Sequence, residues 1–199
     1  MTRPVSEEGR PVPWGVAFAE PPSEAASAQP TAQVTRSPLD HFFFGLSSAA
    51  DHSILWLALG SLRAARVGDP AVAVRLATVL GAESALTNGL IKSVFRRLRP
   101  EPHPDLQATD GPLPYGLHRP ITSSFPSGHA TAAFAAATLL ADGRRSGAGY
   151  FGLAAMVAAS RVYVGLHHPS DVVVGSMLGL AFGAVARRFL PLRPAPKRH

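Results

Sequence analysis

The stretch "SSFPSGHATAAF", Ser123–Phe134, places a group of polar, reactive residues at the start of an alanine-rich apolar run. Pro126 and Ser127 are typical of a helix start, because serine caps free N–H groups and proline favours the first turn. Gly128 and His129 follow directly. A helix start carries free N–H groups and a positive dipole, and glycine lets an anion approach them. The stretch therefore predicts either a plain helix cap with a half-exposed histidine or an anion site.

The composition limits the classes of protein to be considered. The chain has 199 residues, which suits one domain with a sizeable core. It has 19 Lys and Arg against 13 Asp and Glu, and a net charge of +6 fits nucleic acid, anionic lipid or a phosphate-bearing substrate as partner. The absence of cysteine excludes disulfides and thiolate metal sites. The acidic, proline-rich N-terminus does not predict a secretory signal.

Three parts follow from the patterning along the chain. Residues 1–38 are rich in Pro, Ala, Ser and Glu without apolar periodicity, which predicts a disordered N-terminal tail. Residues 39–190 form the predicted helical domain, and residues 191–199 a basic C-terminal tail. Within the domain, residues 100–125 are dense in Pro, Gly and Asp, which indicates a long ordered or lid-like loop.

The apolar stretches of the domain have the length and alanine content of helices. A Phe-rich segment over 39–50, preceded by the cap-like Ser37, predicts an amphipathic helix at a membrane surface or a core helix. A bilayer span needs about 20 apolar residues, and the three C-terminal stretches are shorter, so hydropathy leaves a membrane bundle and a soluble bundle open. The other five predicted helices cover 54–62, 71–91, 128–141, 147–164 and 172–186.

Two features favour the membrane bundle. Gly175, Gly179 and Gly183 are spaced four apart, which predicts a close contact with a neighbouring helix. The apolar stretches are extended by charged residues only at their ends, where long cationic side chains can reach the membrane surface.

A second cluster, "KSVFRRLRP", covers Lys92–Pro100. Lys92 and Arg99 are seven residues apart, which predicts that they share one helix face, and Pro100 is expected to end that helix. The alternative interpretation is an ordinary basic helix end in solvent.

A third cluster, "SRVYVGLHHPSD", covers Ser160–Asp171 and contains Arg161 and His167. His167 and Asp171 are four residues apart, so the carboxylate can hold the imidazole in one tautomer and raise its nucleophilicity. Pro169 between them indicates a loop-to-helix junction. The alternative is a histidine satisfied at a helix interface. Because helices of alternating direction bring all three clusters to one level, we expect one basic, histidine-bearing pocket.

Together the patterns K-x6-R-P, P-S-G-H and S-R-x5-H-x3-D resemble the three-part signature of the type 2 phosphatidic acid phosphatase (PAP2) superfamily. All three parts are present in order over 92–171. The resemblance implies an all-α, membrane-embedded bundle of five to six helices. Membrane members of the family commonly have six spans, and here the segment at 39–50 stands in place of the first, which leaves five.

The resemblance also implies a role for each matched residue. His167 would attack phosphorus to give a phosphohistidine, Asp171 would orient His167, and His129 would protonate the leaving oxygen. The residues that would bind the phosphate are Lys92, Arg99, Ser127, Gly128 and Arg161.

Elementary chemistry agrees with these roles. Phosphoryl transfer needs charge neutralisation, an in-line nucleophile and protonation of a poor leaving group. Three cations and helix-end N–H groups can replace metal ions, so we expect neither metal nor any other cofactor. His168 is expected to line the pocket. The remaining histidines are expected on the surface or in loops: His41, His52, His103 and His118.

Charge asymmetry predicts the orientation in a membrane. With the cations of the three clusters set aside, nine arginines and lysines alternate with the cluster-bearing ends and mark the cytoplasmic side, so the active site is expected on the non-cytoplasmic side. These markers are Arg63, Arg66, Arg144, Arg145, Arg187, Arg188, Arg193, Lys197 and Arg198.

The leading hypothesis is an integral-membrane lipid phosphate phosphatase acting on a phosphomonoester or diphosphate. Its expected partners are membrane lipids and a substrate such as phosphatidic acid, phosphatidylglycerol phosphate, a polyprenyl diphosphate or a polyprenyl-linked sugar phosphate. One alternative is an enzyme similar to vanadate-dependent haloperoxidases, which the short chain and near-spanning helices disfavour. Another is a non-catalytic basic membrane or nucleic-acid-binding protein. Nucleic acid is not expected as a partner, because only 8% of residues are aromatic and the cations gather at helix ends.

Overall fold

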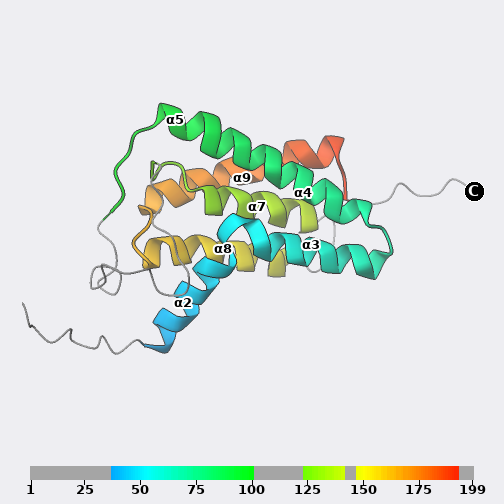
Figure 1. Cartoon of the computed structure of the whole chain (residues 1–199), viewed down its shortest axis with the longest axis horizontal. Helices are drawn as coiled ribbons and strands as arrows, with labels where there is room; N and C mark the ends of the chain where they lie inside the picture. Colours follow the sequence, from blue (N-terminus) through cyan, green and yellow to red (C-terminus); the bar gives the residue numbers. More distant parts are fainter. Residues whose placement is uncertain (1–36, 101–122, 142–146, 193–199) are drawn as a thin grey trace, which may run out of the picture. The chain divides into compact units, whose positions relative to one another are not determined.

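The computed structural model describes residues 37–100, 123–141 and 147–192, and within these ranges it is helical without strands. The predicted all-α fold is thus confirmed. Most of the predicted tails at 1–38 and 191–199, and of the loop at 100–125, falls outside the described residues. The longer helices in Figure 1 are α2 (Pro38–Ala49), α3 (Ile54–Val67), α4 (Ala71–Ser84), α7 (Gly128–Ala141), α8 (Gly147–Tyr163) and α9 (Pro169–Phe189).

Three shorter elements connect them. A 3-10 turn, η1 (Asp51–Ser53), joins α2 to α3. A π-helix, η2 (Ala85–Ile91), and the short α5 (Lys92–Val94) continue α4 without an intervening residue. π-helical turns are rare and are frequently found at functional sites. The irregular elements η1 and η2 both border the site described below.

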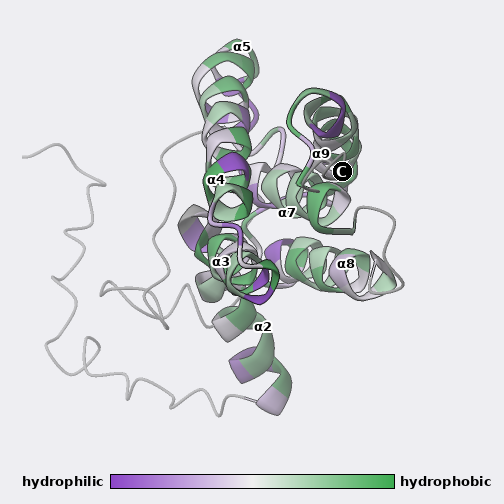
Figure 2. Ribbon diagram, turned by 90° about the vertical axis from the view of Figure 1, so that its right-hand side faces the viewer, coloured by the Kyte–Doolittle hydropathy of each residue, from purple (hydrophilic) through white to green (hydrophobic). Residues whose placement is uncertain are grey.

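Helix α7 is the central helix of the described bundle. It contacts α4, α8 and α9, and Figure 2 shows it between these three helices. Ten of its residues are buried, most of them alanines, whose small side chains let neighbouring helices approach closely. The predicted helix over 128–141 matches α7 at both ends. The motif "PSGH" therefore leads into the most buried helix of the described chain.

The glycines of α9 let it pack directly on α7. A Cβ atom added to Gly175 would lie 2.6 Å from the carbonyl oxygen of Ser127, and one added to Gly183 would lie 2.7 Å from Cβ of Thr138. A Cβ on Gly179 would meet the backbone of α7 as well. The close helix contact predicted from the glycine spacing is confirmed.

Helix α2 is capped as its sequence predicts and is anchored on α8. The Ser37 hydroxyl accepts a hydrogen bond from the backbone N–H of Asp40 (3.2 Å), and the Asp40 carboxylate accepts one from the Ser37 N–H (2.7 Å). The Tyr163 hydroxyl donates to the same carboxylate at 2.7 Å, and the Tyr163 ring stacks on Phe43. Helices α2 and α3 meet at an angle of 69° across η1.

By length and composition, one described helix, α9 with 21 residues, could cross a membrane alone. Helices α2 and α3 meet the same criterion only when taken as one bent span. The outward face of α9 is apolar, with Val173, Met177 and Val185 exposed.

The cluster at 92–100 is not one helix, and the expectation that its cations share a helix face is wrong. The helix ends at Val94, and the chain beyond it is extended. The Ser124 N–H donates to the Arg97 carbonyl at 3.0 Å, so this extended segment pairs with the segment that precedes α7. These hydrogen bonds replace those of a helix and turn Arg99 back toward the loop between α8 and α9.

Candidate active site

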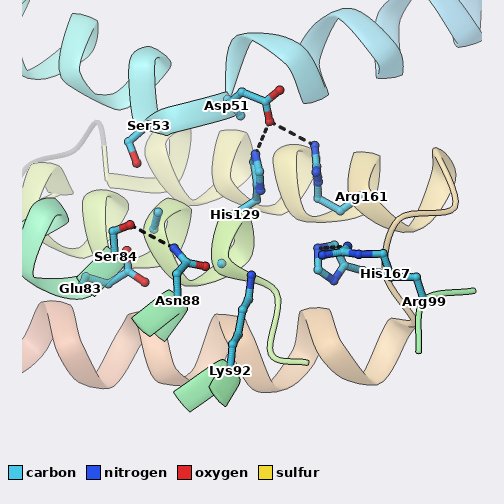
Figure 3. A pocket seen from close by; sticks show the side chains of 13 residues that line it. Asp51, Ser53, Glu83, Ser84, Asn88, Lys92, Arg99, His129, Arg161 and His167 are labelled. Carbon is cyan, nitrogen blue, oxygen red and sulfur yellow. Dashed lines mark hydrogen bonds and ion pairs between the residues drawn. The ribbon is translucent and has the colours of Figure 1, made fainter. Parts of the chain in front are cut away.

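The three sequence clusters converge on one cavity of about 380 Å³ at the ends of α7 and α8 (Figure 3). Two of the eight predicted site residues, Ser127 and Asp171, are fully buried and do not line the cavity. The other six line it: Lys92, Arg99, Gly128, His129, Arg161 and His167.

Gly128 keeps the start of α7 open. A Cβ at this position would lie 3.0 Å from Oδ1 of Asn88 and 3.6 Å from Nζ of Lys92. A side chain at this position would thus crowd Asn88 and Lys92, and the binding of a phosphate at Gly128 stays a prediction. The Ser127 hydroxyl has a different environment, because it is buried and accepts from the Ala130 N–H at 3.5 Å, as a cap of α7.

The orientation of His167 is fixed by the segment before α7. Its Nδ1 lies 2.7 Å from the carbonyl oxygen of Ser124. A carbonyl can only accept, so Nδ1 carries the hydrogen and Nε2 carries the lone pair. Nη1 of Arg99 lies 3.4 Å from that Nε2 and is held by the Leu166 carbonyl at 2.7 Å. His167 therefore presents an unprotonated nitrogen beside the Arg99 guanidinium.

The surroundings of His167 keep it neutral. Burial, followed by the positive charges of Arg161 and Arg99, lowers the pKa of His167 to about 2. Both effects disfavour the charged imidazolium, so the imidazole is neutral across the physiological range. Neutral imidazole is the form that can attack phosphorus.

Asp171 lies next to His167 but forms its short contacts elsewhere. Its Oδ2 is 3.8 Å from Nδ1 of His167, which is longer than a hydrogen bond, and accepts instead from the His168 N–H at 2.9 Å. Its Oδ1 accepts from Nη1 of Arg97 at 2.8 Å. Asp171 thereby caps α9 and fixes the loop that holds His167. That it orients His167 in the reaction stays a prediction.

His129 has a carboxylate partner that sequence reasoning missed. Its Nε2 lies 2.6 Å from Oδ1 of Asp51, and the same oxygen lies 3.6 Å from Nη1 of Arg161 (Figure 3). Arg161 is buried and also donates to the hydroxyl of Ser47. Asp51 comes from η1 and is 78 residues from His129 in the chain. The sequence does contain a signal for this residue, because Asp51 is the only Asp, Glu, Lys or Arg within the mostly apolar residues 41–62.

The histidines outside the cavity have no part in it. His168 was expected to line the cavity, but it does not, and it is instead the N-cap residue of α9. His41 is exposed on α2, as predicted. The side chain of His52, and His103 and His118, lie outside the described residues. Within the described ranges no group of three or more His, Asp or Glu side chains is placed to hold a metal ion.

Comparison with known proteins decides the family. The family model "PAP2 superfamily" matches residues 72–194, which is more than half of the chain. The chain belongs to the PAP2 superfamily. The relationship predicted from the three motifs is confirmed. Because its curated relatives are named phosphatases, the chain is a PAP2-type phosphatase rather than a haloperoxidase-like enzyme or a non-catalytic protein.

Among curated proteins, a decaprenylphosphoryl-5-phosphoribose phosphatase of Mycobacterium tuberculosis is 37% identical over 145 residues, covering 71% of this chain and 75% of the relative. A lipid A 1-phosphatase of Rhizobium johnstonii is 38% identical over 104 residues, covering 51% of this PAP2 chain and 39% of the relative.

Solved structures show the same fold. The transmembrane PAP2-type phosphatidylglycerolphosphate phosphatase of Bacillus subtilis matches with a TM-score of 0.60 at 24% identity, covering 78% of each chain. Aquifex aeolicus LpxE matches with a TM-score of 0.55 at 30% identity, covering 77% of this PAP2 chain and 88% of the other.

Proposed function

We propose that this protein is an integral-membrane phosphatase that hydrolyses a lipid-linked phosphate through a phosphohistidine on His167. The observation that carries this proposal is the arrangement of a neutral histidine nitrogen, a histidine–carboxylate pair and three cations around one cavity. Each component supplies one requirement of phosphoryl transfer.

In the first step Nε2 of His167 attacks phosphorus, an N–P bond forms, and the P–O bond to the leaving group breaks. Lys92, Arg99 and Arg161 neutralise the phosphoryl oxygens, and the open start of α7 at Gly128 adds backbone donors. In the second step water attacks the phosphohistidine, the N–P bond breaks, and inorganic phosphate leaves. Vanadate resembles five-coordinate phosphorus and should inhibit by occupying the same place.

The leaving oxygen takes its proton from His129. With Nε2 directed at Asp51, the other ring nitrogen of the protonated imidazole is free to donate. Asp51 holds the ring in this orientation, since its Oδ1 lies 2.6 Å from Nε2. After proton transfer the neutral His129 can take a proton from the attacking water, so that one residue serves both steps.

The names of the relatives support a lipid-linked substrate. The mycobacterial relative is named for a decaprenylphosphoryl phosphoribose and the rhizobial one for lipid A 1-phosphate. Both names describe the removal of a phosphate from a lipid compound. The exposed apolar face of α9 suits contact with membrane lipid.

We place the active site on the non-cytoplasmic side of the membrane. Arg66 lies in the last turn of α3, and Arg187 and Arg188 lie in the last turn of α9, while the cavity borders the opposite ends of both helices. The positive-inside rule then assigns the arginine-bearing ends to the cytoplasm. A reporter enzyme fused to the C-terminus should be active in the cytoplasm, and activity only outside it would contradict this orientation.

The proposed function is tested by phosphate release from the detergent-solubilised full chain. We expect turnover of at least one of phosphatidic acid, phosphatidylglycerol phosphate, farnesyl diphosphate and a polyprenyl-linked sugar phosphate, unchanged by EDTA and abolished in His167→Ala. Activity that EDTA removes and only divalent metal restores would reject the metal-independent mechanism. Turnover of all four compounds by His167→Ala at the wild-type rate would reject the proposed nucleophile.

A further inference from the structure

Four polar side chains outside the three motifs line one side of the cavity. Together they are called the polar wall: Ser53 of η1, Glu83 and Ser84 of α4, and Asn88 of η2. In Figure 3 the polar wall lies on one side of Lys92 and His129, and His167 and Arg99 lie on the other. Polar groups therefore line the cavity beyond the place of the phosphate.

The position of the polar wall relates it to the leaving group. In an in-line displacement the leaving oxygen departs on the side of phosphorus opposite to the nucleophile. With Nε2 of His167 on one side of the cavity, the departing group points away from it, past His129 and toward the polar wall. The wall is thus the surface that contacts whatever the phosphate is attached to.

Glu83 has an unsatisfied oxygen in this wall. Its side chain is 1% exposed, and Oε1 has no hydrogen-bond partner among the described residues, although the carboxyl group is hydrogen-bonded to Thr87. A buried acceptor left without a donor costs about 1–3 kcal/mol, so such groups usually have a partner that comes with a ligand or water. A hydroxyl group is the simplest donor.

Asn88 and Ser84 complete the surface. The Asn88 amide donates to the Ser84 hydroxyl at 3.0 Å, and its Oδ1 lies over Gly128 at the start of α7. The π-helical turn η2 carries Asn88 into this position next to Lys92. The amide and hydroxyl groups can both donate and accept, which suits several neighbouring hydroxyls on one ligand.

We propose that the polar wall binds the hydroxyl groups of a sugar or similar polyol that carries the phosphate, so that the substrate is a lipid-linked sugar phosphomonoester. A simple prenyl or acylglycerol phosphate would leave Glu83 unsatisfied. The inference rests on the proposed function, because the direction of the leaving group follows from His167 as nucleophile.

The test compares two five-carbon phosphomonoesters, ribose 5-phosphate and n-pentyl phosphate, on the solubilised full chain, with farnesyl diphosphate as a third probe. Wild type should have the higher kcat/KM for ribose 5-phosphate. Two variants test the wall: Glu83→Gln keeps the size of the side chain, and Asn88→Ala changes an exposed position. Each should lower kcat/KM for ribose 5-phosphate about tenfold and change kcat/KM for n-pentyl phosphate less than about twofold. Neither variant should change turnover of farnesyl diphosphate by more than about twofold, because a prenyl chain carries no hydroxyl group for the wall.

The control is Thr78→Val, an exposed position of α4 away from the cavity, which should leave all three probes unchanged. Equal losses on both monoesters would show that Glu83 and Asn88 only maintain the fold, and unchanged values would show that the wall contacts no substrate. Either result overturns the inference while His167-dependent turnover of n-pentyl phosphate keeps the proposed function. Absence of His167-dependent turnover with every probe would overturn both.

Discussion

Replacement of Asp51 by asparagine isolates the charge of the pair with His129. Asparagine keeps the size of the side chain and one acceptor oxygen, so the 2.6 Å contact can persist without its negative charge. A hydrogen bond to a charged group contributes about 1.5–3 kcal/mol, against about 0.5–1.5 kcal/mol for a neutral one. The midpoints of these ranges differ by about 1.3 kcal/mol, which corresponds to roughly a tenfold loss in the protonation of a poor leaving group.

The assay compares two leaving groups on the same purified variant. An alkyl phosphate needs the proton from His129, whereas 4-nitrophenyl phosphate releases a stable anion without it. Asp51→Asn should lower kcat for n-pentyl phosphate about tenfold and for 4-nitrophenyl phosphate less than about threefold. Asp69→Asn is the matched control, because Asp69 accepts from the Ala71 N–H at the start of α4 and does not line the cavity.

Two outcomes would refute this reasoning. An equal loss on both substrates would mean that Asp51 does not act through the acid step. Tighter vanadate binding with an unchanged dependence on the leaving group would mean that the carboxylate, which is close to both His129 and Arg161, competes with the substrate for the anion site.

Three further predictions concern the cations proposed to bind the phosphate, the contact between α7 and α9, and the nucleophile. Arg99→Lys and Arg161→Lys should each lower kcat/KM at least about tenfold, because an ammonium cannot replace a planar guanidinium fork, whereas the control Arg66→Lys should leave kcat/KM unchanged. Wild-type rates in both Arg99→Lys and Arg161→Lys would contradict their role in binding phosphate. Gly179→Ala should lower the free energy of unfolding by about 1–3 kcal/mol, since its Cβ would meet Thr131 and lie 3.0 Å from Cβ of Phe134. The control Gly152→Ala, with no heavy atom within 4 Å of the added Cβ, should raise the free energy of unfolding by up to about 1 kcal/mol, and equal changes of the two variants in thermal denaturation would refute this. With its pKa lowered to about 2, His167 should stay neutral in histidine NMR of the folded protein down to about pH 4. In the unfolded chain it is protonated below about pH 6.5, so a fall in pH favours unfolding, and a titration near pH 6.5 in the folded protein would contradict this prediction.

The features that the sequence predicts well depend on neighbouring residues. The start of α7 at Gly128 follows from a helix-start pattern, and the contact of Gly175 with Ser127 follows from glycines on one face of α9. The junction at Pro169 is likewise a local signal, because proline fits the first turn of a helix. Such signals identify helices and the residues at their ends.

Contacts between distant segments could not be predicted in the same way. Asp51 approaches His129 only because α2 and α3 bend at η1, and nothing in the motifs specifies that bend. Arg99 was expected on a helix, but backbone pairing of its segment with the residues before α7 turns it toward His167. Glu83 lies within an apolar stretch, where a buried carboxylate is itself a sign of function.

His167 is expected to become phosphorylated during turnover, and trapping the phosphoenzyme tests this most directly. His129→Ala should slow the second step more than the first when 4-nitrophenyl phosphate is the substrate, so that the phosphoenzyme accumulates. Rapid quenching under alkaline conditions, which preserve phosphohistidine, followed by peptide mass spectrometry should place the phosphate on His167, and His167→Ala should carry none. A phosphate on any other residue, or release of 4-nitrophenol by His167→Ala at the rate of the parent enzyme, would contradict the account.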